Sequence, residues 1–401
     1  MTKAASGQPA ASSAVVPGPV KGLSAVSLLN DFASEMVYPL LPAFVTRTLG
    51  GGALALGALD GAADLTASLL RAVSGRWADR PGWQRPLIIA GYGIAAAVRP
   101  LIALAGSASQ VIVARMTDRV GKGLRSPARD AMIAQLTPPA AHGRAFGFHR
   151  AADHLGAVAG SLLAWLMLSR GTDVRGVIAW SVLPGLLAMV VLLRVLPKAP
   201  EHAAAGPDPA RDEAAVPGPA PAFWIPVGAM TLLIVSRLPE TLLLLRLQDL
   251  GVSVTVVPLI WAGLHVVRTL AAYPGGWLSD RIGPRAMLAA GALLFGSALV
   301  VIARDLSAPL AMVVFLVLGL VTGLSEASDR QVVAALARGA QGRAFGNAQA
   351  LAGLAALPAG LAFGAVYQRS GGPTALHASA VASLVALVLW LVVTARSPKK
   401  P

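Results

Sequence analysis

Long apolar stretches separated by short polar connections dominate the chain. A membrane-spanning helix needs about 20 apolar residues at a rise of about 1.5 Å per residue. Twelve stretches meet this requirement: Gly22–Phe44, Ala53–Gly75, Pro86–Ala105, Gln110–Leu136, Ala145–Leu168, Gly176–Leu196, Phe223–Leu243, Val254–Leu278, Ala286–Ala303, Leu310–Leu336, Phe345–Tyr367 and Thr374–Val393. The pattern predicts an all-α integral membrane protein with twelve transmembrane helices.

The polar connections divide the chain into five parts. Residues 197–222 are rich in Pro and Ala and cannot bury enough apolar surface to fold alone, which predicts a linker between two halves. Residues 1–21 lack a basic stretch followed by an apolar core, so we expect a disordered tail rather than a signal peptide. The predicted parts are the tail 1–21, a six-helix half 22–196, the linker 197–222, a second half 223–393 and a tail 394–401.

Composition agrees with this pattern. The chain of 401 residues is 55% hydrophobic and 13% charged, which leaves too little polar surface for a water-soluble protein. It has no cysteine, which excludes disulfides, thiolate catalysis and zinc–thiolate sites. The net charge of +14 could indicate a nucleic-acid partner, but no basic run is interleaved with aromatic residues, so we expect none.

The positions of Lys and Arg predict the orientation in the membrane. Sixteen of them lie in the tails and the even-numbered connections, and six lie in the odd-numbered connections. Basic residues collect on the cytoplasmic side of membrane proteins. We therefore expect both termini and the linker in the cytoplasm of a multi-pass membrane protein.

Two short motifs occur once in each half. Residues 75–82 and 276–283 both read Gly-x-x-x-Asp-Arg-x-Gly, 201 positions apart, and residues 143–147 and 342–346 both read Gly-Arg-Ala-Phe-Gly, 199 positions apart. Asp130 and Asp329 are also separated by 199 positions. Matches at nearly one offset indicate an internal repeat of six helices in the same orientation.

With these motifs, the chain resembles the bacterial, twelve-helix type of the major facilitator superfamily over its full length. The resemblance implies secondary transport by alternating access in the bacterial inner membrane, by a monomer without a cofactor. It also implies that the repeated loops close the cytoplasmic side. The expected gating residues are Gly75, Asp79, Arg80, Gly82, Arg129, Asp130, Gly276, Asp280, Arg281, Gly283, Asp329 and Arg330. The alternative is that they only fix the topology and a tight turn.

Charged residues also occur inside the predicted spans, where each must face a cavity or a partner. In the fourth span, the charges from Arg115 to Asp130 fall within an arc of about 140°. That face predicts the wall of a central cavity. The expected cavity residues are Asn30, Asp60, Asp64, Arg115, Asp118, Arg119, Lys122, Arg150, Arg237, Glu240, His265 and Glu326. The alternative is pairing between neighbouring side chains, for example Arg237 with Glu240.

Four of the buried titratable residues are candidates for proton coupling. A carboxylate in a dry cavity can bind and release a proton as access alternates. Asp31 and Glu35, one helical turn apart, are the first candidates, and His149 with Asp153 the second.

These observations favour a proton-coupled transporter of a small organic solute. Guanidinium groups suit carboxylate or phosphate, so we expect an anionic substrate. Gly147, Gly156 and Gly160 partly match the antiporter pattern of drug exporters, which favours export, although small residues also let helices pack closely. The alternatives are a multidrug exporter, an uptake symporter and an intramembrane sensor. The six histidines show no HExxH or similar spacing, so we expect no metal site and no enzyme.

Overall fold

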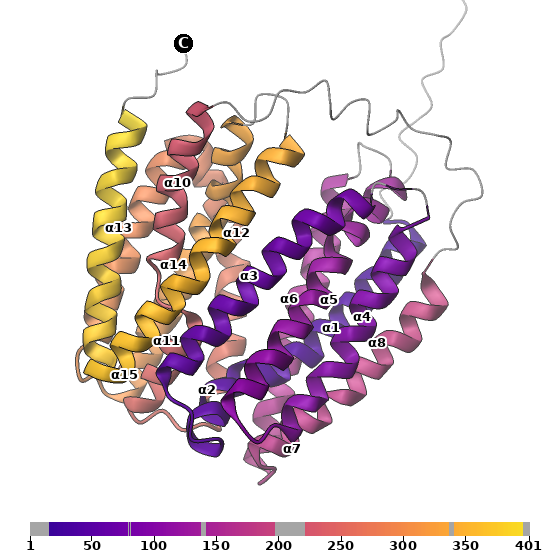
Figure 1. Cartoon of the computed structure of the whole chain (residues 1–401), viewed down its shortest axis with the longest axis horizontal. Helices are drawn as coiled ribbons and strands as arrows, with labels where there is room; N and C mark the ends of the chain where they lie inside the picture. Colours follow the sequence, from indigo (N-terminus) through magenta and orange to yellow (C-terminus); the bar gives the residue numbers. More distant parts are fainter. Residues whose placement is uncertain are drawn as a thin grey trace, which may run out of the picture.

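A computed structural model of the chain consists of helices and short connections. It describes residues 16–78, 80, 82–137, 142–196, 221–336 and 341–395, and these ranges contain no β-strand. The helices run roughly parallel to one another in two groups, with the N-terminal half and the C-terminal half side by side (Figure 1). We call the end of the bundle where α1 begins and α15 ends the terminal end, and the opposite end the distal end.

The N-terminal half is built from long helices with short breaks between them. Its main helices are α1 (Gly18–Val37), α3 (Ala53–Ala78), α4 (Gln84–Leu101), α5 (Ala108–Gln135), α6 (His142–Ser169) and α8 (Val182–Val195), and the shorter α7 (Val174–Trp180) precedes α8. Between α1 and α3 the chain forms the short α2 (Leu41–Ala43). A 3₁₀-helical turn at Tyr38–Leu40 precedes α2, and a π-helical turn at Phe44–Thr48 follows it. A further tight turn, Ile102–Leu104, follows α4.

The C-terminal half follows the same plan. Its helices are α10 (Pro221–Val235), α11 (Glu240–Asp249), α12 (Val257–Ile282), α13 (Pro284–Ile302), α14 (Ala308–Leu336) and α15 (Gln341–Ala395). α15 contains two antiparallel helices, because the chain reverses at Gly371, whose φ of 82° suits a residue without a Cβ.

Three predicted spans are interrupted rather than continuous. The first changes its helical pitch after Val37, where Pro39 and Pro42 lack the N–H that an α-helix needs. The sixth divides into α7 and α8 at Ser181. The seventh breaks after Val235 and resumes beyond Pro239, so its two pieces can present different side chains to the centre of the molecule.

The twelve-helix prediction is confirmed. Within the described ranges, eight helical segments are long and apolar enough to span a membrane, and one of them, Ala344–Ala395, crosses twice through the turn at Gly371. The helices α1, α5 and α12 complete the twelve crossings, with more charge or a shorter apolar stretch than the others.

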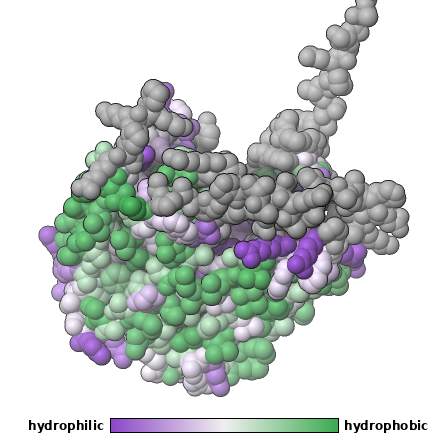
Figure 2. All heavy atoms as spheres, turned by 45° about the horizontal axis from the view of Figure 1, so that its top comes forward, coloured by the Kyte–Doolittle hydropathy of each residue, from purple (hydrophilic) through white to green (hydrophobic). Residues whose placement is uncertain are grey.

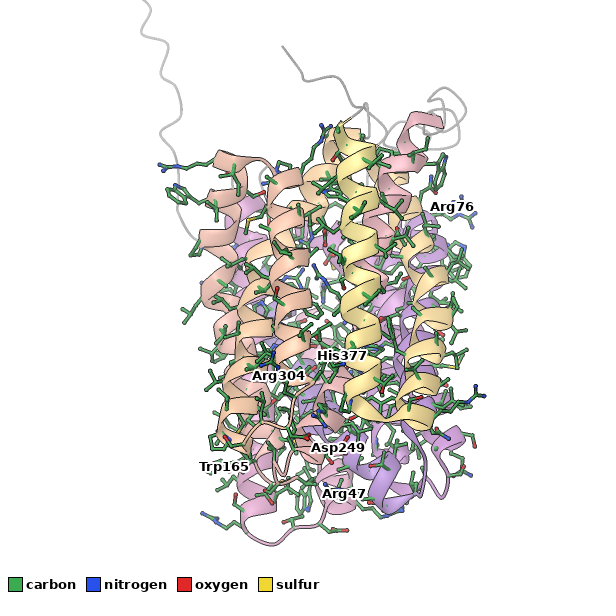
Figure 3. The ribbon with its side chains drawn as sticks, turned by 90° about the vertical axis from the view of Figure 1, so that its left-hand side faces the viewer. Arg47, Arg76, Trp165, Asp249, Arg304 and His377 are labelled. Atoms are coloured by element: carbon green, nitrogen blue, oxygen red, sulfur yellow. The ribbon has the colours of Figure 1, made fainter. Side chains whose placement is uncertain are left out.

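The outer surface fits a lipid environment. Apolar residues cover most of the visible flank of the bundle, with polar residues gathered towards its margins (Figure 2). Leu186, Leu187 and Val190 on α8, for example, are each about half exposed. Arg76 lies towards the terminal end and Arg47 towards the distal end, where charged side chains can reach water (Figure 3).

The two halves share a core at one end only. At the distal end, a single apolar cluster includes Phe44 and Leu56 of the first half and Leu247 and Tyr367 of the second. At the terminal end each half has its own cluster, around Tyr92 in the first half and Trp390 in the second. The bundle is therefore closed at the distal end, while its halves are packed separately at the terminal end.

Candidate functional site

A cavity of about 490 Å³ lies between the halves near the middle of the bundle. Both halves contribute to its wall, from α1, α3 and α5 on one side and from α12, α15 and the break between α10 and α11 on the other. Its charged lining residues are Glu35, Asp60, Asp64, Arg71, Arg115, Arg119, Lys122, Arg237, Glu240 and Arg268. Six of these are basic and four are acidic, so the wall carries a formal excess of positive charge.

That excess comes from α5. Neither Arg119 nor Lys122 has a hydrogen-bond or ion-pair partner for its charged group among the described side chains. The Nε atoms of Arg115 and Arg119 are both buried without an acceptor. Buried charge without a partner is expensive, so these groups are suited to an anion that enters the cavity.

An ion-pair network lies behind this face of α5. Arg99 of α4 donates from Nε to Asp118 Oδ1 at 3.0 Å, and from its Nη atoms to the backbone and side-chain oxygens of Asn30, both at 2.9 Å. Arg115 Nη1 lies 3.5 Å from Asp118 Oδ2. All four residues are at most 3% exposed. The network joins α1, α4 and α5, and it fixes the helix that presents the cations.

Several polar contacts between the halves lie on the distal side of the cavity, while nearer the terminal end Arg71 Nη1 donates to Gln349 Oε1 at 3.3 Å. Trp261 Nε1 donates to Glu35 Oε2 at 2.8 Å, and His265 Nε2 lies 3.7 Å from the same oxygen. Asp60 Oδ2 accepts from the backbone N–H and the hydroxyl of Thr241, at 3.2 and 2.7 Å. A carboxylate of the first half therefore meets donors of the second half twice.

Tyr38 connects two of these charged groups within the first half. Its hydroxyl donates to Asp60 Oδ1 at 3.3 Å, and the Arg115 guanidinium lies 4.8 Å from its ring centroid. The ring also packs against Trp261, with 5.2 Å between the ring centroids. Tyr38 follows the first break in the helix of α1, so the break places an aromatic side chain at the junction of the halves.

The alternative to a cavity role, pairing of Arg237 with Glu240, is not formed. Arg268 Nη2 donates to Glu240 Oε1 instead, and the Arg237 guanidinium lies 5.4 Å from the centroid of the Phe295 ring. The break at Pro239 separates the two residues, which would have shared a face of an unbroken helix.

The predicted cavity residues divide into three groups. Eight line the cavity: Asp60, Asp64, Arg115, Arg119, Lys122, Arg237, Glu240 and His265. Three do not line it, because Asn30 and Asp118 belong to the network around Arg99 and Arg150 is largely exposed beside Asp153. Glu326 lies in α14, but its side chain is outside the described part of the structure.

The four candidates for proton coupling have different surroundings. Of these, Glu35 lines the cavity. Asp31 accepts from Asn30 Nδ2 at 2.9 Å. His149 Nδ1 lies 3.2 Å from Ser24 Oγ, and its Nε2 is 3.6 Å from Asp153 Oδ1, which is an ion-pair distance rather than a hydrogen bond.

The expected gating residues lie at the terminal end. Arg129 donates to Asp130 Oδ1 and to Ser27 Oγ, and in the other half Asp280 accepts from Gln331 Nε2. Gly82 and Gly283 have φ of 79° and 87°, as the repeated tight turn requires. Arg281 stacks on Trp277, whereas Arg80 and Arg330 are exposed. Asp329 lies in α14. A Cβ added at Gly75 or Gly276 would meet open space. Asp79 lies outside the described residues.

The glycines of α6 have a packing role. A Cβ on Gly156 or Gly160 would lie 2.2 Å from a backbone oxygen of α1, at Leu28 and Phe32 respectively. At Gly147 there is open space. Two of the three positions are thus explained by close approach of helices.

Six residues of the site are not among the predicted site residues: Arg71, Arg99, Arg268, Tyr38, Thr241 and Trp261. The three arginines are charges within apolar spans, which by itself is a signal of function or pairing. The other three carry no charge, so no pattern along the chain distinguishes them from packing residues.

Comparison with known proteins agrees with this architecture. The family model of the Major Facilitator Superfamily matches residues 23–245 and again 223–401. An uncharacterized MFS-type transporter of Methanocaldococcus jannaschii is 26% identical over 385 residues, which cover 92% of this chain and 94% of that protein. The Fosmidomycin resistance protein of Escherichia coli is 29% identical over 183 residues, 44% of this chain and 43% of its own.

Solved structures share the fold. The crystal structure of the nucleoside transporter NupG superposes with a TM-score of 0.74 at 13% sequence identity, over 96% of this chain and 100% of that one. The family match covers both halves, in agreement with the internal repeat and with the two six-helix groups of the fold. The chain therefore belongs to the Major Facilitator Superfamily, a family of membrane transporters.

Proposed function

We propose that the protein is a secondary transporter of small organic anions. The observation that carries this proposal is the pair Arg119 and Lys122, two cations on the cavity wall without an acidic partner at ion-pair distance among the described residues. Guanidinium and ammonium groups bind carboxylate, phosphate and phosphonate through charge-assisted hydrogen bonds. An anion would supply the acceptors that the protein itself does not.

Glu35 is the group that we propose to couple transport to protons. It lines the cavity and accepts a hydrogen bond from Trp261 of the other half, so its surroundings must change when the halves separate at the distal end. A carboxylate whose environment alternates is suited to bind a proton in one state and release it in the other. Asp31, with Asp153 in electrostatic reach, is the second candidate.

Export is the direction that we propose. The excess of Lys and Arg at the terminal end supports a cytoplasmic position for that end, so the cavity would take its substrate from the cytoplasm. Similarity to a Fosmidomycin resistance protein supports the same direction. Uptake of a metabolite and export of uncharged drugs are the alternatives.

The test is flux in proteoliposomes that hold the purified protein, with and without a proton gradient. The panel comprises a short carboxylate, a phosphonate, a sulfonate and a quaternary-ammonium drug. We expect gradient-dependent flux of anions, and a fall of about tenfold or more for Arg119→Gln and Lys122→Gln, because each loses a hydrogen bond to a charged group. Arg170→Gln, at an exposed position far from the cavity, should leave flux unchanged.

The coupling residue is tested in the same vesicles. Glu35→Gln should abolish the response to the proton gradient while leaving exchange of anion for anion intact. A full gradient response in both Glu35→Gln and Asp31→Asn would reject proton coupling by this pair. Transport of the quaternary ammonium in preference to all anions would reject the anionic substrate.

A further inference from the structure

The packing of small residues fixes which positions of the two halves correspond. A Cβ on Gly123 of α5 would lie 2.4 Å from Leu70 Cβ of α3, and a Cβ on Gly323 of α14 would lie 3.0 Å from Ala271 Cβ of α12. These two contacts join equivalent helices of the repeat. They relate α5 to α14 by a shift of 200 positions and α3 to α12 by a shift of 201 positions.

A second contact supports the same register. A Cβ on Gly91 of α4 would lie 2.6 Å from Arg125 Cβ, and a Cβ on Gly291 of α13 would lie 3.2 Å from Ser325 Cβ. Gly91 and Gly291 are 200 positions apart, and so are Arg125 and Ser325. The register is therefore set by the contacts of α5 and α14 with two different neighbours.

In this register, the cationic face of α5 corresponds to an uncharged face of α14. Phe315 stands where Arg115 does in the first half, Gly319 where Arg119 does, and Thr322 where Lys122 does. The buried Asp118 corresponds to Leu318. The repeat thus keeps the backbone and replaces the charges by apolar or neutral groups.

The uncharged face of α14 lines a space of its own. A pocket of about 370 Å³ adjoins the cavity on the side of the second half and shares five residues with it: Arg237, Leu238, Glu240, His265 and Arg268. We call it the apolar lobe, because its wall includes Leu243, Leu264, Phe295, Phe315, Leu318 and Gly319. Its other polar lining residues, beyond those shared with the cavity, are His154, Thr322 and Asp329. The cavity and the lobe therefore adjoin at these five residues and have chemically different linings.

The charged groups at the boundary leave the lobe available to an apolar group. Arg268 is bound to Glu240, and Arg237 lies over the Phe295 ring, so the charge of Arg268 is balanced inside the protein. His265 lies at the junction and faces the first half, with its Nε2 3.7 Å from Glu35 Oε2.

We propose that the substrate is an amphipathic anion, with its acidic group against Arg119 and Lys122 and its alkyl or aryl part in the apolar lobe. This inference rests on the proposed function and specifies the class of anion. The acidic group satisfies unpaired cations, and the apolar part removes hydrocarbon from water. Arg119 and Lys122 belong to the first half and the apolar lobe to the second, so such a ligand would contact both halves at once.

The test measures binding of n-alkanesulfonates with tails of two to six carbons to the purified, full-length protein by calorimetry. Sulfonates remain ionised near neutral pH, so every member of the series carries the same negative charge. We expect affinity to rise about fourfold for each added methylene, the effect of about 0.8 kcal/mol per buried CH₂. Alkyltrimethylammonium ions and n-alkanols with the same tails serve as controls for charge, and both should bind weakly at every length.

Two variants locate the tail. Leu318→Ala enlarges the lobe and should shift the preferred tail to longer chains by about two carbons. Gly319→Ala, whose new Cβ would lie 2.2 Å from the flexible Leu264 Cδ1, pushes that side chain into the lobe and should shorten the preferred tail. Arg119→Gln should weaken binding of all sulfonates by the same factor, because it contacts the acidic group alone.

The outcomes separate this inference from the proposed function. Sulfonates that bind with an affinity independent of tail length would overturn the inference and leave an anion transporter. Binding of no anion at all would overturn both. The length series of the unmodified protein decides the question by itself, so a variant that fails to fold does not affect the result.

Discussion

The two halves of this molecule share a backbone plan and differ in what holds their interiors together. In the first half, helices are joined by buried ion pairs, chiefly Arg99 with Asp118 at 3.0 Å. In the second half, the ion pair of Arg268 with Glu240 is partly exposed, and uncharged side chains such as Ser236 and Ser383, 3.1 Å apart, make buried contacts. The repeat therefore conserves the close approach of helices, which depends on small residues, and leaves the chemistry of the facing side chains free to diverge.

That difference has a consequence for function. A charged network can hold Arg115 in place beside two unpaired cations, which an apolar interior could not do without a large desolvation penalty. The apolar lobe of the second half can accommodate hydrocarbon. A transporter in which both halves carried the same chemistry would offer its ligand one kind of contact twice.

The largest expected effect comes from making the first half resemble the second. Arg99→Leu leaves Asp118 buried with Arg115 alone, at the longer distance of 3.5 Å. We expect it to lower the free energy of unfolding by about 3–5 kcal/mol, the effect of breaking a buried ion pair. The measurement is the thermal midpoint of the detergent-purified protein.

The triple variant Arg99→Leu/Arg115→Phe/Asp118→Leu is the matched test, because it copies Leu299, Phe315 and Leu318 of the other half. It should recover most of the lost stability, since it removes all three charges of the network and leaves none of them buried without a partner. A triple variant as unstable as the single one would show that the network cannot be exchanged for apolar packing.

A smaller effect is expected from copying one cavity residue across the repeat. Lys122→Thr introduces the residue found at position 322 and removes an unpaired cation. We expect the affinity for organic anions to fall about ten- to a hundredfold, as for loss of a hydrogen bond to a charged group. Calorimetric titration measures the change, with Lys21→Thr at an exposed site as the control. Equal affinity in both variants would remove Lys122 from the site.

The contact between the halves provides a third test. Trp261→Phe removes the donor to Glu35 and should shift the equilibrium about tenfold towards a state open at the distal end, for a contact of about 1.4 kcal/mol. The protein has no cysteine, so Ala53→Cys at the distal junction gives a single reactive thiol whose labelling rate reports the opening. Trp180→Phe, on the exposed outer surface, is the control. An unchanged labelling rate would mean that this hydrogen bond does not favour the closed state.

The smallest effect is expected within the second half. Ser383→Ala removes the hydrogen bond to Ser236 and should lower the free energy of unfolding by about 0.6 kcal/mol, the average for such contacts between membrane helices. The thermal midpoint measures it, and Ser297→Ala, whose hydroxyl bonds within its own exposed helix, should cause no change. A loss as large as that of Arg99→Leu would contradict the contrast between the halves.

The linear pattern predicted the spans because the bilayer acts on each helix separately. A stretch of about 20 apolar residues must cross as a helix whatever its neighbours are, and the ends of α3 and α5 lie within a few residues of the prediction. The break at Pro239 was missed, since a proline inside an apolar stretch can either kink a helix or divide it. Because of that break, Arg237 and Glu240 do not form the pair that the unbroken helix would have allowed.

The sequence by itself determined that the protein spans a membrane, that it repeats, and that one face of α5 is too charged for lipid. These follow from periodicity and composition, which need no knowledge of contacts. The tertiary structure decided which charges meet. It placed Asp118 with Arg99, left Arg119 and Lys122 unpaired on a cavity wall, and placed apolar residues of α14 on the wall of the adjoining lobe. Pairing depends on distances of a few ångströms between helices that lie far apart in the chain, and only packing fixes those distances.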